Sequence, residues 1–255
     1  MTDLILNLSP EQWAMAVIVS LIAGLIKGVI GFALPTIFMM GLSVVVAPSL
    51  ALAAMIIPTV VTNLYQAFRT GLPAAVASTV QFKYFLGIGF LCLMGSAQLS
   101  VIVPSHFFLA ALGGVVTFFS LMQLVGWQLP IRGPSLRAEI TMGAVAGFLG
   151  GMSGVWGPPT VAYLTALNTP KRDQMRVQGV VYGLGAMALV FAHAISGILT
   201  LKTAAFSAIL LVPAMIGMAL GTAIQDKIDQ RVFRRITLVV LLVAGVNLLR
   251  RAMMG

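Results

Sequence analysis

Residues 24–35 read GLIKGVIGFALP, and residues 147–158 read GFLGGMSGVWGP. Both stretches place three glycines and a proline in the order G-x3-G-x2-G-x3-P, and the second lies 123 residues after the first. Glycine-rich membrane helices share a composition because small residues let helices pack closely, so composition alone is the alternative explanation. Four matched positions in order, at the same relative place in each half of the chain, favour a duplication instead.

The rest of the sequence is strongly apolar. Of its 255 residues, 60% are hydrophobic and 8% are charged, whereas a soluble domain carries roughly 25% charged residues. A soluble globule of this size cannot hide so much apolar surface, so much of that surface must face lipid. The chain is therefore expected to be an integral membrane protein with the lipid bilayer as its partner, and a soluble fold is excluded.

Polar gaps divide the chain into apolar runs that are candidates for membrane segments. The runs are 12–33, 35–47, 50–68, 79–99, 106–127, 138–156, 158–169, 177–200, 203–225 and 233–249. A membrane-spanning helix needs about 20 residues, so 35–47 and 158–169 are short for a crossing. Each begins at a proline, Pro35 or Pro158, and proline suits the first turn of a new helix. We therefore expect an all-α polytopic membrane protein with eight to ten membrane segments and broken or re-entrant helices near these two prolines.

Lysine and arginine gather in the gaps after odd-numbered runs. Cytoplasmic loops favour positive residues, so these gaps are expected in the cytoplasm and the N-terminus in the periplasm. Arg250 and Arg251 at the C-terminus conflict with this assignment. The same rule explains the net charge of +9 without the nucleic-acid partner that a basic protein otherwise suggests.

Five runs in each half turn the second half upside down relative to the first. The expected organisation is a first membrane repeat over residues 1–128, a cytoplasmic linker over 129–137 and a second membrane repeat over 138–255. Inverted repeats recur in secondary transporters, which hold their substrate near the bilayer midplane with discontinuous helices. The two glycine-rich stretches occupy matching places in the halves, so they are the expected location of a binding site.

At residues 24–35 and 147–159, and in the pattern of the spans that follow, the sequence resembles the TauE/SafE sulfite-exporter family. This family is also described as the four-toluene-sulfonate-uptake family. The resemblance covers most of the chain and rests on glycine and proline patterns without catalytic residues. It implies transport, with export favoured, of small sulfur-containing anions such as sulfite, sulfoacetate or isethionate across a bacterial inner membrane. It also implies a duplicated helical bundle with the binding site between the halves.

The charged residues of the sequence favour an anion as the cargo. The acidic residues are assigned to the termini and to the gaps between runs; they are Asp3, Glu11, Glu139, Asp173, Asp226 and Asp229. That distribution disfavours a cation site, a carboxylate proton relay and an intramembrane metal enzyme. Lys27 is the main basic residue inside a run, and its ammonium is expected to attract an anion. The alternative is that Lys27 extends to the membrane interface.

Backbone N–H groups at the proline breaks form a second expected part of the site. A short helix that starts at Pro35-Thr36 or Pro159-Thr160 presents unpaired N–H groups and the positive end of its dipole, which together bind anions. The expected substrate-binding residues of the two breaks are Lys27, Gly28, Gly31, Pro35, Thr36, Gly151, Ser153, Gly154, Trp156, Pro158 and Thr160. The alternative is that the glycines only let helices touch.

Polar side chains in the runs that follow the two breaks complete the expected site. Asn63 and Gln66 lie in the third run, and Gln178 and Tyr182 lie in the eighth. These four residues either line the same cavity or hydrogen-bond helices to one another. His193 is the one histidine in the interior of a run, because His106 stands at the edge of the run 106–127. It is expected either to carry a proton, if transport is coupled to protons, or to be a packing residue.

These features together predict a secondary transporter that works by alternating access, with a small anion held near the midplane by the N-termini of broken helices. A passive anion channel is the first alternative, and a membrane-embedded enzyme is the second. The runs hold no set of side chains with the roles of a catalytic site and no nucleotide-binding loop. We therefore expect no catalytic residue, no metal site and no cofactor.

Overall fold

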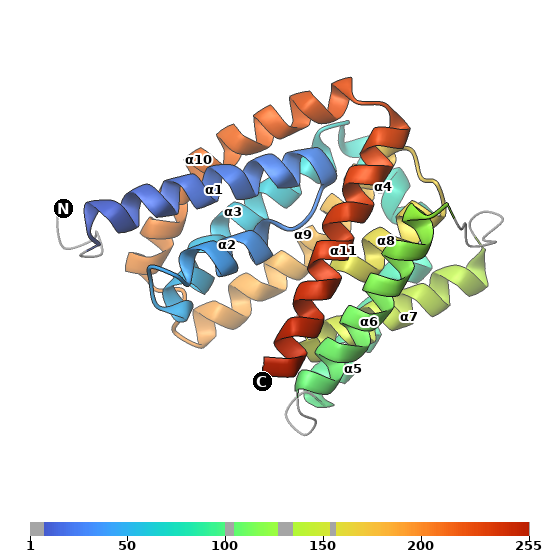
Figure 1. The fold of residues 1–255 in the computed structure, drawn as a ribbon, viewed down its shortest axis with the longest axis horizontal. Coiled ribbons are helices and arrows are strands. Elements are labelled where there is room, and N and C mark those ends of the chain that lie inside the picture. Colours follow the sequence, from blue (N-terminus) through green and yellow to red (C-terminus); the bar gives the residue numbers. More distant parts are fainter. Residues whose placement is uncertain (1–7, 100–104, 127–134, 154–156, 255) are drawn as a thin grey trace. The chain divides into compact units, whose positions relative to one another are not determined.

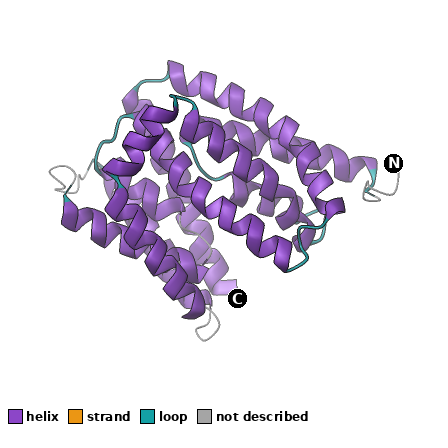
Figure 2. Cartoon of the chain, turned by 180° about the vertical axis from the view of Figure 1, so that it is seen from behind, coloured by secondary structure: helices purple, strands orange, loops and turns teal. Residues whose placement is uncertain are grey.

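The computed structural model describes residues 8–99, 105–126, 135–153 and 157–254. In these ranges the regular structure is helical throughout, without a strand (Figure 2). The helices, α1 to α11 in chain order (Figure 1), divide into two compact units. The first unit contains Met1–Ala75 and Met175–Asp229, and the second unit contains Val76–Gln174 and Gln230–Gly255.

Each unit draws its helices from both predicted repeats. The first unit holds α1 (Pro10–Ile30), α2 (Leu34–Leu42), α3 (Pro48–Phe68), most of α9 (Lys171–Ile195) and α10 (Leu201–Lys227). The second unit holds most of α4 (Leu72–Gln81), α5 (Lys83–Leu99), α6 (Ser105–Leu124), α7 (Leu136–Ser153), α8 (Gly157–Ala166) and α11 (Gln230–Met254). A compact unit reflects contacts in space, whereas a repeat reflects matched sequence, so the repeat boundaries remain a prediction.

Long apolar helices confirm the all-α polytopic membrane fold. Within the described residues, five helices are long and apolar enough to cross a membrane, namely α1, α3, α9, α10 and α11. A sixth crossing results if α4 and α5, which meet at a bend of 71°, count as one broken span. The short helices α2 and α8 contain nine and ten residues, in agreement with the short runs expected at these places.

The helices α1 and α10 of the first unit are parallel neighbours (Figure 1). Near the start of both helices, the rings of Trp13 and Phe206 meet edge to face with centroids 5.2 Å apart. Near the end of both helices, Gly28 faces the backbone of Met218 so closely that an added Cβ would lie 2.4 Å from the Met218 oxygen. The two helices therefore run side by side in the direction that the parity of their runs predicts.

Helix α3 runs in the same direction as α10. Near the start of each helix, the Ser207 hydroxyl donates to the backbone oxygen of Ala54 at 2.8 Å. At the other end, the Arg69 guanidinium forms an ion pair with the Asp226 carboxylate at 2.5 Å. The basic ends of α3 and α10 thus lie at the same end of the first unit, as the positive-inside assignment of their two gaps requires.

The short helix α2 leads the chain back toward the start of α1. Helix α1 ends at Gly31, with a left-handed φ of +87°, and Ala33 follows at +77°, so the chain turns sharply before α2. The side-chain amide of Gln12, in the first turn of α1, then donates to the backbone oxygen of Val45 at 2.7 Å. The chain has therefore returned to the starting end of α1 before α3 begins at Pro48. This path favours a thin crossing over a re-entrant arm for the run 35–47, and the crossing remains a prediction.

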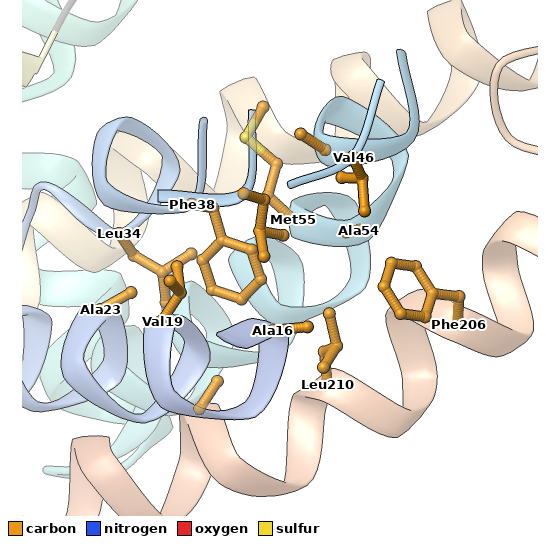
Figure 3. Packing of buried hydrophobic residues seen from close by; sticks show 13 residues of the cluster. Ala16, Val19, Ala23, Leu34, Phe38, Val46, Ala54, Met55, Phe206 and Leu210 are labelled. Carbon is orange, nitrogen blue, oxygen red and sulfur yellow. The ribbon is translucent and has the colours of Figure 1, made fainter. Parts of the chain in front are cut away.

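An apolar stripe fixes α2 in the core of the first unit. Leu34, Phe38 and Leu42 follow one another at intervals of four residues, which places them on one face of a helix, and all three are fully buried. Figure 3 shows this face packed among side chains of α1, α3 and α10, with Val19 beside the Phe38 ring. The nine-residue helix is therefore held by tertiary packing, since a helix this short is marginal on its own.

Close backbone contacts occur at the first glycine of each glycine-rich stretch. An added Cβ on Gly24 of α1 would lie 2.0 Å from the backbone oxygen of Ala214 of α10, inside the first unit. The matching Gly147 of α7 has the same relation to Gly89 of α5, also at 2.0 Å, inside the second unit. For this position of the pattern, the structure supports the interpretation that glycine lets two helices touch. The inverted relation of the halves remains a prediction.

Candidate functional site

The strongest candidate site in the described residues is built around Lys27. This residue lies in the last turn of α1 and is only 1% exposed. Its ammonium donates a buried hydrogen bond to the side-chain oxygen of Asn63 on α3. The two helices are able to place these side chains together because they run parallel and end at the same end of the unit. Lys27 therefore turns into the protein and does not extend to its surface.

The partners of Lys27 leave its positive charge uncompensated. Among the described side chains, the ion pair of the first unit joins Arg69 to Asp226, and it does not include Lys27. The amide nitrogen of Asn63, which is 1% exposed, has no hydrogen-bond partner in the described part of the chain. An ammonium has three donors and no acceptor, so this pair presents unused donors and a net positive charge.

Two glutamines and Gly31 lie beside this pair. The neighbouring carbonyls at the end of α1 assign the Gln178 amide of α9 the orientation in which its nitrogen donates to Ile30 and Gly31, at 3.1 Å each. The Gln66 amide nitrogen of α3 donates to the backbone oxygen of Met175 at 2.6 Å. An added Cβ on Gly31 would lie 1.9 Å from the Gln178 amide, and the left-handed φ of +87° also favours glycine here. These glutamines connect α1, α3 and α9, which supports the interpretation of both as interhelical hydrogen-bonding residues.

The structure also gives the positions of the other residues that were expected at the first break and on α9. Gly28 faces α10, where an added Cβ would meet the backbone of Met218 and Thr222. Pro35 and Thr36 stand in the first turn of α2, where Thr36 is exposed and no side chain caps the helix. Tyr182, which follows Gln178 by about one turn of α9, is buried.

The expected residues of the second break belong to the second unit. Pro158 and Thr160 are buried in α8. Gly151 and Ser153 fall at the end of α7. Gly154 and Trp156 lie outside the described residues. The placement of these residues leaves their expected role in binding a prediction.

His193 lies apart from the Lys27 cluster within the first unit. It stands in the last turn of α9, partly exposed, and its Nδ1 atom has no partner in the described ranges. The fifteen residues that separate it from Gln178 correspond to about 22 Å along a helix. His193 therefore takes no part in the cluster, and its role as a proton carrier remains a prediction.

Sequence reasoning missed part of the polar face of α3. Thr59 and Thr62 are buried on the same helix as Asn63 and Gln66, and the spacing 59, 62, 63 and 66 places all four on one face. Both threonine hydroxyls donate to backbone oxygens one turn earlier, at 2.6 and 2.5 Å. Helical periodicity of the polar residues was the signal that would have identified this face as one unit.

The arrangement provides chemistry suited to holding a small anion. A buried ammonium and a free amide N–H are both able to donate to an anion's oxygen atoms, and a hydrogen bond from the charged ammonium is stronger than a neutral one. The flanking Thr59, Thr62 and Gln66 side chains donate to backbone oxygens, while the Gln66 Oε1 atom is buried without a partner among the described residues. The site is thus a built donor cluster within a membrane-spanning bundle.

The fold and this site define a class, that of polytopic membrane proteins with a buried cation paired to an amide and not to a carboxylate. Residues 16–248 match the family model described as sulfite exporter TauE/SafE. The chain belongs to this family and is therefore a membrane transport protein, which confirms the resemblance expected from the sequence. No curated protein and no solved structure gives a further match.

Proposed function

We propose that the protein is a secondary transporter for small sulfur-containing anions, with export favoured, and that Lys27 and Asn63 bind the anion. The proposed substrates are sulfite and organosulfonates such as sulfoacetate and isethionate. The observation that carries this proposal is the burial of Lys27 against Asn63 without a carboxylate in its described surroundings. The proposed location is a bacterial inner membrane with the N-terminus in the periplasm.

The energetic argument starts from the cost of a buried ammonium. A lysine inside a membrane segment costs at least about 2.5–3.5 kcal/mol on insertion scales, and a single neutral hydrogen bond offsets only part of that amount. An anion bound beside Lys27 would neutralise the charge, and its oxygens would accept from the unpartnered Asn63 nitrogen. The site is therefore more favourable when it is occupied by an anion than when it is empty.

The break before α2 supports a further contribution from the backbone. The N-terminus of α2 has no side-chain cap, so its first N–H groups need another acceptor. It follows α1 by the short turn through Gly31 and Ala33, two residues with left-handed backbones. We include these N–H groups, with Gly31, Pro35 and Thr36, in the proposed site, and the matching residues of the second break in its counterpart. Discontinuous helices of this kind support alternating access between inverted repeats.

Flux measurements on purified protein in liposomes test the proposal. Radiolabelled sulfite and isethionate should enter protein-containing vesicles with saturable kinetics. Lys27→Met should lower kcat/KM at least about tenfold, since a hydrogen bond to a charged group contributes about 1.5–3 kcal/mol, and Lys27→Arg should retain part of the flux. Lys202→Met is the matched control, because Lys202 is an exposed lysine in the first turn of α10.

Three outcomes would contradict parts of the proposal. Equal flux with and without the protein would show that the protein does not transport these anions. Flux that rises linearly with substrate and does not saturate would identify a passive channel instead of a carrier. Equal effects of Lys27→Met and Lys202→Met would remove Lys27 from the binding site and leave the transport activity standing.

A further inference from the structure

Glu139 occupies a place that the sequence did not indicate. It was assigned to a polar gap although it stands at the start of the run 138–156, and it lies in the first turn of α7 and is only 7% exposed. That expectation is wrong because α7 begins at Leu136 and packs against α5 and α8, which cover the carboxylate. A buried acidic side chain in a membrane helix is rare and usually functional.

The hydrogen bonding of Glu139 is incomplete. The backbone of Phe85 on α5 donates to its carboxylate. The other carboxylate oxygen, Oε2, is buried without a partner among the described residues. A buried carboxylate needs hydrogen-bond partners for both of its oxygens. Here only one oxygen has such a partner, so the charged form is incompletely stabilised and Oε2 is available to bind a proton.

Tyr163 on α8 provides a second unpartnered group at the same place. Its side chain is 1% exposed, and its ring stacks on Phe85 with centroids 5.5 Å apart and planes 6° apart. Its hydroxyl is buried without a partner in the described ranges, and it lies within electrostatic reach of the Glu139 carboxylate. Phe85 thus connects the two residues, with its backbone on Glu139 and its ring on Tyr163.

Other charged groups near Glu139 leave it unpaired. From α5, Lys83 is close enough to interact, but its exposed ammonium lies over the Tyr84 ring, 5.0 Å from the centroid. Arg137, on α7 itself, is exposed. From α8 the titratable residue is Tyr163, and from α6 it is His106, in the first turn of that helix. The helix dipole would stabilise an exposed carboxylate at the start of α7 as well as a buried one. The dipole therefore does not explain why the Glu139 side chain is buried.

We propose that Glu139 and Tyr163 form a proton-binding site in the second unit, and that proton uptake at this site drives anion transport. In the step itself, the carboxylate of Glu139 takes a proton from water and becomes a carboxylic acid, and release to water restores the carboxylate. The two groups are not hydrogen-bonded to each other in this structure, and in the proposed site the Tyr163 hydroxyl is the partner of the carboxyl group, because a phenol can both donate and accept. The coupling part of this proposal rests on the proposed anion transport, whereas the proton site itself does not.

Infrared spectroscopy tests the proton site independently of transport. Spectra of the purified protein at high and low pH should differ by a carboxylic-acid band, which Glu139→Gln abolishes. Glu11→Gln is the matched control, because Glu11 also lies in a first helical turn but is exposed, and this variant should keep the band. Tyr163→Phe keeps the ring and removes the hydroxyl, so it should shift the pH at which the band appears. An unchanged band in both Glu139→Gln and Tyr163→Phe would overturn the site.

Isethionate transport in liposomes tests the coupling, because a sulfonate stays ionised while the pH varies. Exchange of isethionate across the membrane, which needs no net proton movement, should survive in Glu139→Gln. Accumulation driven by a proton gradient should be lost in that variant and kept in Glu11→Gln. Equal accumulation in Glu139→Gln and wild type would overturn the coupling. If Glu139→Gln fails to fold, Tyr163→Phe decides, since wild-type accumulation with an unaltered pH profile would contradict the proposal. If the wild type transports no anion, the proposed function fails and the infrared result still decides the proton site.

Discussion

Lys27 and Asn63, which are 36 residues apart in the chain, meet as a buried ammonium and a neutral amide oxygen. An amide oxygen accepts the hydrogen bond without cancelling the charge, whereas a carboxylate in its place would form an internal ion pair. The pair therefore orients the ammonium and keeps its charge available. This relationship makes the identity of residue 63 as informative as that of Lys27.

Asn63→Asp should abolish anion transport while the protein stays folded. The new carboxylate would form an ion pair with the Lys27 ammonium and neutralise its charge, because opposite charges in contact interact strongly in a buried site. The carboxylate would also repel the anionic substrate. We expect a loss of flux at least as large as that of Lys27→Met, with an unchanged or higher melting temperature. Flux assays and thermal unfolding in detergent measure the two effects.

Asn247→Asp provides the matched control for this substitution. Asn247 lies on α11 in the second unit and accepts from Arg250 at 3.1 Å, so the same change there also places a carboxylate beside a cation. Normal flux is expected in this control. Wild-type flux in Asn63→Asp would show that the charge of Lys27 is not used by the substrate.

Gly31→Ala should destabilise the first unit and displace the glutamines around the turn. A non-glycine residue in a sparsely populated backbone conformation costs about 1–3 kcal/mol, and the added Cβ would also overlap the Gln178 amide. Gly197→Ala separates the two causes, because Gly197 has a φ of +74° but no atom within 4 Å of the added Cβ. The melting temperature should fall further in Gly31→Ala, and an equal fall in both variants would show that contact with the glutamine is unimportant.

Gly24→Ala and Gly147→Ala should each lower the melting temperature, because an added methyl would force two helix backbones apart. Gly114 in α6 has open space around it, and alanine there is expected to be neutral or stabilising by about 0.5–1 kcal/mol. Thermal unfolding of the three variants provides the comparison. A stable Gly147→Ala with an unstable Gly24→Ala would show that the matched glycines have different roles in the two halves.

Single cysteines at residues 44 and 70 should react from opposite sides of the membrane. Val44 is exposed and lies next to Val45, at the starting end of α1, whereas Thr70 accepts a hydrogen bond from Arg176 at the other end of the unit. Cys92 is the one native cysteine, so the test uses a Cys92→Ser background and an impermeant maleimide. Labelling of both positions from the same side would contradict the crossing by α2.

Several elements of the fold could be predicted because they depend on local sequence. The glycine and proline pattern indicated the break at Gly31 and the short helix that follows it, since both depend on backbone preferences near the break. The apolar runs anticipated the long helices. The helix α4 was missed because its ten residues, Leu72–Gln81, extend across a gap that was assigned to a loop.

The candidate site could be predicted in its composition but not in its pairing. Asn63, Gln66 and Gln178 were expected near Lys27, and the structure brings these four together. Which amide meets the ammonium depends on the rotation of α3 and α9, and that rotation is set by packing with distant residues. Glu139 was misplaced for a related reason, since burial at the start of a helix depends on the neighbouring helices and not on the residues beside it.

The length of α2 has a consequence for the surrounding lipid. Nine residues rise only about 13.5 Å, whereas the hydrocarbon core of a bilayer measures about 30 Å. The chain completes the rest of this crossing through residues 43–47, where a non-helical backbone requires either burial or contact with water. Where this segment faces the bilayer, we expect the membrane to thin, or headgroups and water to reach inward. We therefore expect the rate of transport to depend on the acyl-chain length of the host membrane.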